Sequence, residues 1–338
     1  MNARFPKVSI LWILAVAFLV ASPLAFGAKE RATSAGRSAT AGVVVVNTTL
    51  AYGGRAAGTG VVLTSSGEVL TNNHVIRGAR SVRVTDTSTG RTYSATVAGY
   101  SVARDIALLK LRNAHGLASA LIGTSSNLEV GARVVAIGNA GGTGVLTAKT
   151  GKLLRVGRSI TITDDDGGST RLTGLIETSA PLRPGDSGGP LLSNGRVIGI
   201  DAAATSSFRF RGEGGTGFAV PIDTALQIAG RIEAGQSTTT VHVGPTAFLG
   251  VALAPSGIAQ DVSGALVQGV SPDSPAATAG IGRDDVITAF AGTRVRSSTD
   301  LRKLVLRFAP GRVVRVTWLD RFTGSSSASV RLVSGPPQ

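Results

Sequence analysis

The chain has 338 residues, a formal net charge of +14, 43% hydrophobic residues, only 4% aromatic residues and no cysteine. This length allows two domains that each bury a core, and the lack of cysteine excludes disulfides, a thiol nucleophile and thiolate metal sites. The arginines are spread along the chain without a dense basic block, so we interpret the charge as a solvated basic surface and expect no nucleic-acid partner.

Residues 1–28 are typical of an export signal. Arg4 and Lys7 precede an apolar stretch at 8–21, and Ala25-Phe26-Gly27 supplies small residues at the spacing that signal peptidase accepts. The uncharged span is also long enough to cross a bilayer of about 30 Å. Two alternatives therefore stand, a cleaved signal peptide and an uncleaved membrane anchor. Both predict a periplasmic, cell-envelope or secreted protein.

Residues 42–233 are predicted to form a β-rich domain after a flexible linker at 29–41. Short β-type runs are separated by turn residues at the intervals of a barrel or sandwich. The clearest runs lie at 43–46, 60–63, 82–85, 106–111, 134–137, 160–163 and 197–200. One segment, 223–233, has helical periodicity, and Asp223 is its predicted N-cap.

A second linker is predicted at 234–244, where small and polar residues predominate. The remaining segment, 245–336, mixes strands with two helical stretches at 274–279 and 298–307. We therefore expect a smaller second domain of mixed composition.

Three local signals follow one another in the order His, Asp, Ser. His74 stands at the end of a predicted strand within 70–76, and Asp105 immediately precedes the strand at 106–111. Ser187 lies in Gly-Asp-Ser-Gly-Gly-Pro at 185–190. An isolated histidine or aspartate is usually structural, but six specified residues rarely coincide by chance. The order is that of chymotrypsin-type triads.

The chemistry of acyl transfer requires these residue types. A serine hydroxyl is a weak nucleophile that needs an adjacent base, and His74 would take its proton and later protonate the leaving amine. Asp105 would fix the histidine tautomer. The glycines allow the backbone amides of Gly185 and Ser187 to form an oxyanion hole.

The sequence resembles the HtrA/Deg family of trypsin-like proteases over roughly residues 42–336. Gly58-Thr59-Gly60 with 70–76 is similar to the family's histidine block, 105–111 to its aspartate block and 217–221 to its closing strand. The resemblance implies a mainly β fold, in which a chymotrypsin-like double β-barrel protease domain is followed by a small α+β PDZ domain. It also implies the triad named above, the Gly185 and Ser187 oxyanion hole and a homotrimer.

Two residues depart from the family pattern. Asp186 and Arg183 stand where the family commonly has asparagine. A buried, unpaired carboxylate is costly, so we expect Asp186 to be solvated, paired (for example with a nearby arginine) or part of a switch. The leading function is ATP-independent proteolysis of misfolded exported proteins without a cofactor, since no Gly-rich nucleotide-binding loop occurs. The alternative is a latent protease that acts as a chaperone or signalling scaffold.

By analogy with the family, five residues line the pocket for the side chain before the scissile bond: Pro181, Leu182, Asp201, Ala202 and Ala203. Pro181 carries no charge, which favours small or medium aliphatic side chains over lysine or arginine. The carboxyl group of Asp201 argues against that preference.

Residues 245–336 resemble a circularly permuted PDZ domain. Phe248-Leu249-Gly250-Val251 is similar to the loop that receives a peptide's C-terminal carboxylate, and the following strand edge would pair with the peptide. The segment 298–307 would form the opposite wall of the groove.

Other polar clusters are interpreted as structural. Asp164-Asp165-Asp166-Gly167 is predicted to be a turn and not a metal site, and 208–211 a surface or regulatory loop. His115 and His242 lie in loop-like contexts, and we assign them structural roles.

Overall fold

The computed structural model describes residues 40–338 apart from 52, 164–168, 203–208, 211–215, 256–262 and 321–323. In this part of the chain no helix has the length and apolar character that a membrane span requires. The predicted signal peptide or anchor at 1–28 lies outside the described residues.

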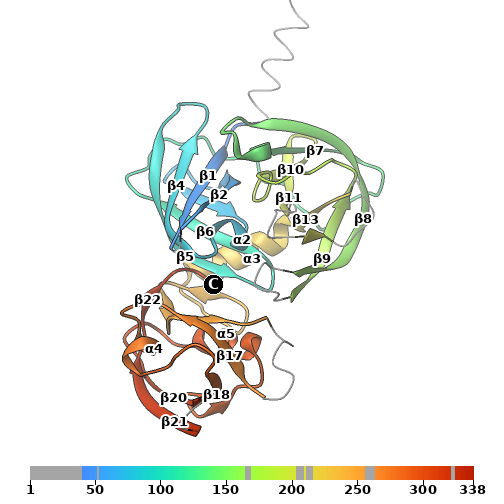
Figure 1. The fold of residues 1–338 in the computed structure, drawn as a ribbon. Helices are drawn as coiled ribbons and strands as arrows, with labels where there is room; N and C mark the ends of the chain where they lie inside the picture. The colour runs from blue at the N-terminus through green and yellow to red at the C-terminus, as the bar shows by residue number, and fades with distance from the viewer. Residues whose placement is uncertain are drawn as a thin grey trace, which may run out of the picture. The chain divides into compact units, whose positions relative to one another are not determined.

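The first part of the N-terminal domain is a closed antiparallel barrel (Figure 1). Its strands are β1 (Val43–Leu50), β2 (Arg55–Val62), β3 (Glu68–Thr71), β4 (Ala79–Asp86), β5 (Thr92–Ser101) and β6 (Ile106–Leu111). The order is β5-β4-β1-β2-β3-β6, and a further pairing between β5 and β6 closes the ring. The interior is filled mainly by valine and leucine, as the low aromatic content leads one to expect.

The second barrel follows the same principle. Its strands are β7 (Arg133–Gly138), β8 (Thr147–Thr163), β9 (Ser169–Thr178), β10 (Pro190–Ser193), β11 (Arg196–Ala202) and β13 (Gly217–Pro221). They are ordered β8-β7-β10-β11-β13-β9, and pairing between β8 and β9 closes the ring, with β12 (Arg209–Phe210) added beside β8. The double-barrel prediction is confirmed.

The helical segment after β13 is α3 (Ile222–Glu233). Its N-cap is Pro221, so the prediction of Asp223 as the N-cap is wrong. Asp223 lies in the first turn, and its Oδ2 accepts hydrogen bonds from the Thr124 hydroxyl and the Ser125 backbone N–H, both at 3.0 Å. The helix therefore begins two residues earlier than a cap at Asp223 would allow, at the buried Ile222. The carboxylate therefore anchors a neighbouring loop.

The segment predicted as the second linker carries a short strand, β14 (His242–Val243), which pairs with β5. The remaining short elements among the described residues of the N-terminal domain are α2 (Asn73–Ile76) and the 3-10 turn η1 (Ala140–Gly142).

The C-terminal domain combines an antiparallel sheet with two helices. The sheet order is β16 (Val251–Leu253), β17 (Ala265–Val270), β18 (Val286–Phe290), β20 (Val313–Asp320) and β21 (Gly324–Arg331), with β19 (Thr293–Arg294) paired to β18. A separate pair joins β15 (Thr246–Phe248) to β22 (Val333–Gly335). The helices are α4 (Pro275–Thr278) and α5 (Ser298–Val305), as the two helical stretches predicted.

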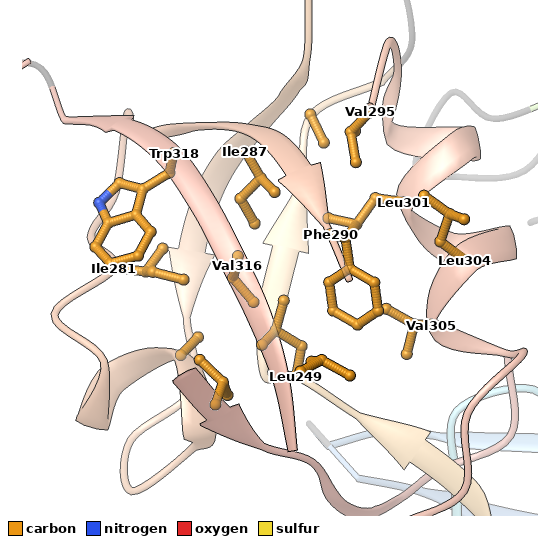
Figure 2. Close-up of a cluster of buried hydrophobic side chains, with 14 of the residues drawn as sticks. Leu249, Ile281, Ile287, Phe290, Val295, Leu301, Leu304, Val305, Val316 and Trp318 are labelled. Atoms are coloured by element: carbon orange, nitrogen blue, oxygen red, sulfur yellow. The ribbon is translucent and has the colours of Figure 1, made fainter. Parts of the chain in front are cut away.

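Helix α5 begins at a serine cap and packs on the sheet. The Ser297 hydroxyl accepts from the Asp300 backbone N–H at 3.1 Å, which satisfies an otherwise orphaned donor. Figure 2 shows Leu301 and Val305 of α5 turned toward Phe290 of β18, and all three belong to one buried cluster. This packing fixes α5 as one wall of the domain.

Candidate active site

His74 lies in a single helical turn and not at the end of a strand, so that part of the prediction is wrong. Strand β3 ends at Thr71, and α2 starts two residues later. The buried Asn72 side chain donates from Nδ2 to the backbone carbonyl of Asp105 at 2.8 Å. This bond ties the chain to β6 where β3 ends. The His74 backbone N–H is then directed at Asp105 Oδ1, at 3.0 Å.

Asp105 immediately precedes β6, as predicted, and only 2% of the residue is exposed. Its φ of 52° lies in the left-handed region, which aspartate tolerates better than most residues. Its Oδ2 lies 2.8 Å from His74 Nδ1. Because the same carboxylate bonds both the ring and the backbone of His74, it fixes the orientation of the imidazole. An acceptor at Nδ1 also places the ring proton on that nitrogen.

Ser187 is buried in the loop between β9 and β10. Its backbone carbonyl accepts from the Thr59 N–H at 2.8 Å, which ties this loop to β2 of the first barrel. Gly58 lies between Ser187 and Val75, the neighbour of His74: a Cβ at Gly58 would be 3.0 Å from the Ser187 carbonyl oxygen and 2.7 Å from Val75 Cγ1. The structure therefore places the Ser187 loop of the second barrel against β2 and α2 of the first barrel, on the side where Asp105 binds His74.

The Gly185 backbone, part of the predicted oxyanion hole, is held by both barrels. Its φ is 97°, and a Cβ there would lie 2.1 Å from the Asn139 carbonyl oxygen, so only glycine fits. The Gly185 carbonyl accepts from the Thr59 hydroxyl at 2.7 Å. That hydroxyl in turn accepts from the Asn139 N–H at 2.9 Å. Thr59 thus links the oxyanion loop to the end of β7.

Asp186 is paired, but with a lysine and not with the arginine that the sequence analysis considered. Lys149 Nζ lies 2.7 Å from both carboxylate oxygens of Asp186. The Asp186 side chain is 1% exposed and that of Lys149 is 11% exposed. Arg183 contributes its backbone N–H, which donates to Asp186 Oδ2 at 2.7 Å, while the residue itself is exposed. Sequence reasoning missed Lys149 because nothing local marks it.

Asp201 is the second buried carboxyl of this region, with no exposed surface. Its backbone accepts from the Gly188 N–H and donates to the Gly189 carbonyl, both at 2.8 Å. Neither side-chain oxygen meets a hydrogen-bonding partner among the described residues. Burial, reinforced by the negative charge of Asp186, raises the pKa of Asp201 well above its ordinary value, and Lys149 opposes that shift. The neutral acid is therefore favoured.

The other residues predicted to line the specificity pocket differ in exposure. Pro181 is exposed, Leu182 is half-buried and Ala202 is buried, whereas Ala203 lies outside the described residues. Leu182 packs against β13, since a Cβ added to Gly217 would lie 2.6 Å from its Cγ. An aliphatic side chain thus stands where the pocket wall is expected.

The predicted carboxylate-binding loop of the C-terminal domain connects β15 to β16. Leu249 and Gly250 are buried, and Phe248 and Val251 are half-buried. Gly250 has a φ of 93°, its carbonyl accepts from the Ser271 N–H at 2.8 Å, and a Cβ would lie 2.1 Å from that of Ser274. Strand β16 stands at the edge of its sheet. The loop is therefore rigid and leads directly into a sheet edge.

The other histidines lie elsewhere. His115 is exposed in a loop, and His242 lies on β14 with its ring 5.0 Å from that of Tyr100. Burial lowers the pKa of His242, which favours a neutral, packed ring. The segment Asp164-Asp165-Asp166-Gly167 lies outside the described residues, as do Phe208 and Arg211.

Comparison with known proteins agrees with this architecture. Residues 58–200 match the trypsin-like peptidase domain, and residues 247–321 match the PDZ domain. The fold and the site thus define a trypsin-like peptidase domain followed by a PDZ domain. A serine protease of Lactococcus lactis, described as Do-like HtrA, is 33% identical over 291 residues, which cover 81% of this chain and 70% of that protein. The chain belongs to the HtrA family of serine proteases.

Other relatives are similar over smaller parts of their length. A DegP-like periplasmic serine endoprotease of Chlamydia trachomatis is 37% identical over 273 residues, which cover 76% of this chain and 50% of that protein. The chain spans 50% to 63% of the length of three such curated relatives. The solved structure of the HtrA-type protease AlgW with a tripeptide has a TM-score of 0.52 and 28% identity, and covers 90% of this chain and 98% of that one.

Proposed function

We propose that this protein is an exported, ATP-independent serine endopeptidase that hydrolyses misfolded or damaged extracytoplasmic proteins. The observation that carries the proposal is the pair of bonds from Asp105 to the ring and the backbone of His74, beside the Gly-Asp-Ser-Gly loop of Ser187. The arrangement supplies a nucleophile, a base and a group that orients the base.

Each residue has a distinct role in the proposed reaction. His74 takes the hydroxyl proton of Ser187 through Nε2 as the oxygen attacks the peptide carbonyl. Asp105 holds the other ring nitrogen and stabilises the imidazolium that forms. The amides of Gly185 and Ser187 donate to the oxyanion, and one such donor contributes about 10²–10³ to kcat. His74 then protonates the leaving amine, and water releases the acyl group by the reverse steps.

We further propose that the enzyme cleaves after small or medium aliphatic residues. Leu182 supplies an apolar wall, and the carboxyl group of Asp201 is fully buried with a raised pKa. A neutral, inaccessible carboxyl cannot attract lysine or arginine side chains by charge. This supports the aliphatic preference against the objection that Asp201 raised.

For the PDZ domain we propose recognition of hydrophobic C-terminal peptides. A peptide that adds to the free edge of β16 would bond to its backbone, while the loop at Gly250 receives the carboxylate. Helix α5 would form the facing wall. The AlgW structure that carries a tripeptide supports peptide binding in this family.

Location and assembly are also proposals. Export is supported by the charged and apolar pattern of residues 1–28 and by the periplasmic relative. Membrane association through that segment and assembly into a homotrimer follow from the same sequence pattern and from the family resemblance.

The test is casein hydrolysis by the purified full-length chain beside a Ser187→Ala control, with and without hydrophobic C-terminal peptides. We expect cleavage that the control lacks, products that end in aliphatic residues and faster cleavage with peptide. No cleavage under any condition would reject the endopeptidase and favour the latent scaffold. That alternative rested on the departures at Asp186 and Arg183, and the Lys149 ion pair gives Asp186 a partner.

A further inference from the structure

The carboxylate of Asp186 occupies a site built to hold it. Gly138, the last residue of β7, leaves the space, because a Cβ there would lie 2.6 Å from both Asp186 Oδ1 and Asp186 Cα. One oxygen accepts from the Arg183 backbone N–H at 2.7 Å, and both accept from Lys149 Nζ at 2.7 Å. Because the Asp186 side chain is 1% exposed and accepts three hydrogen bonds, its position is defined.

Lys149 comes from a different element than the loop it holds. It lies on β8, opposite Ala136 of β7, and its ammonium also donates to the Thr147 hydroxyl at 3.1 Å. Asp186 is placed between Gly185 and Ser187, the two residues of the proposed oxyanion hole. The ion pair therefore fixes the middle residue of that loop to the wall of the second barrel.

The charge balance around the pair requires the ammonium. Two buried carboxyls, Asp186 and Asp201, lie near one lysine, and of the two only Asp186 accepts hydrogen bonds from Lys149. A buried carboxylate without a partner is unfavourable, so without Lys149 the Asp186 carboxyl must either take up a proton or move with its loop toward water. Such a movement would turn the amides on either side of Asp186 away from the substrate.

We propose that Lys149 is a positioning residue of the peptidase, whose internal ion pair with Asp186 sets the oxyanion loop without any activating cleavage of the chain. The inference rests on the proposed function. In proteases with Gly-Asp-Ser-Gly that depend on activation, an N-terminal ammonium freed by cleavage pairs with this aspartate. Here a lysine side chain brings the same charge within the intact chain.

The experiment compares full-length parent, Lys149→Met, Lys149→Arg, Asp186→Asn and the double variant Lys149→Met/Asp186→Asn. The substrate is a fluorogenic peptide taken from a casein cleavage site, and a peptide aldehyde that forms a hemiacetal with Ser187 reports on the oxyanion hole. Circular dichroism confirms folding, and intact mass is recorded before and after each assay. We expect the parent to hydrolyse the peptide while its intact mass stays unchanged.

Lys149→Met should lower kcat by about 10²-fold, in the range that one oxyanion donor contributes, with KM changed less than about threefold. The affinity for the peptide aldehyde should fall by a factor similar to that of kcat, a correlation that a purely structural role would not produce. Lys149→Arg should keep part of the activity because it keeps the charge. The double variant should regain at least about tenfold over Lys149→Met, since asparagine needs no ammonium.

A folded Lys149→Met variant with the parent kcat overturns the inference, as does parent activity that appears only after the chain is cut. If Lys149→Met does not fold, the double variant decides between the outcomes. An active double variant supports the inference that Lys149 compensates the charge of Asp186, and a folded but inactive double variant contradicts it. A parent chain that cleaves no substrate rejects the proposed function and this inference with it. An active parent with a Lys149→Met variant of the same kcat rejects the inference alone.

Discussion

The hydroxyl of Thr59 links the oxyanion loop at Gly185 to the end of β7. It donates to the Gly185 carbonyl at 2.7 Å and accepts from the Asn139 N–H at 2.9 Å, and the residue is fully buried. Thr59→Val keeps the shape of the side chain and removes both bonds. Each backbone group left buried without a partner costs about 1–3 kcal/mol. We therefore expect the free energy of unfolding to fall by at least about 2 kcal/mol.

The effect on catalysis should be larger than the stability loss explains. Without the hydroxyl, the peptide group that follows Gly185 can rotate, and the amide before it loses its fixed direction. We expect kcat to fall between about tenfold and 10²-fold, the upper limit being near the contribution of one oxyanion donor. The KM should change little, because the oxyanion hole binds the transition state more than it binds the substrate.

The measurement is kcat and KM on the fluorogenic peptide at a temperature where urea titration shows the variant to be folded. Thr59→Ser is the matched control, since it keeps the hydroxyl and removes only a methyl group, and it should retain kcat. A folded Thr59→Val variant with the kcat of Thr59→Ser would refute the reasoning that this hydroxyl holds the loop.

Two further predictions concern the buried carboxyls. Asp105→Asn should lower kcat by about 10⁴-fold, because an amide that donates to Nδ1 stabilises the wrong His74 tautomer; a loss below tenfold in steady-state kinetics would contradict the assigned role. Asp201 has a pKa raised above its ordinary value of 3.8, so the folded state holds a proton that the unfolded state releases. The contribution of this bound proton to the free energy of unfolding is complete below the ordinary pKa of 3.8. It is lost as pH rises through the folded-state pKa, at up to about 1.4 kcal/mol per pH unit. Asp201→Asn should lack this dependence in urea titrations at pH 5 and pH 7, and parallel curves for the two proteins would disprove it.

The sequence predicted the double barrel and the triad residues because their signals are local. Asp105 directly precedes a strand of apolar residues, and Ser187 lies in a run of six specified residues. The helix at His74 was not predicted, since the strand ends through a bond from Asn72 to the distant Asp105 carbonyl. Strand β5 was not among the predicted runs either, because polar residues occupy much of its first half.

Lys149 was not predictable for a different reason. It lies 37 residues from Asp186 in the chain, and only the β7–β8 register, with Lys149 opposite Ala136, brings it to the carboxylate. A shift of one residue along a strand would turn the side chain to the other face. Arg183 was the more obvious partner by sequence distance, but its backbone N–H makes the contact and the residue is exposed.

The raised pKa of Asp201 favours its neutral form, which helps one lysine to serve two buried carboxyls. If both were ionised, a single ammonium would be shared between them, and the position of Asp186 would depend on that competition. Burial and the charge of Asp186 both raise the pKa of Asp201, so the neutral form leaves the ammonium to Asp186, which it contacts through both oxygens at 2.7 Å. The backbone of Asp201 still contributes, since its carbonyl accepts from the Gly188 N–H next to Ser187. The neutral acid therefore protects the ion pair that we propose sets the oxyanion loop, and ionising Asp201 at high pH should weaken the same support that Lys149→Met removes.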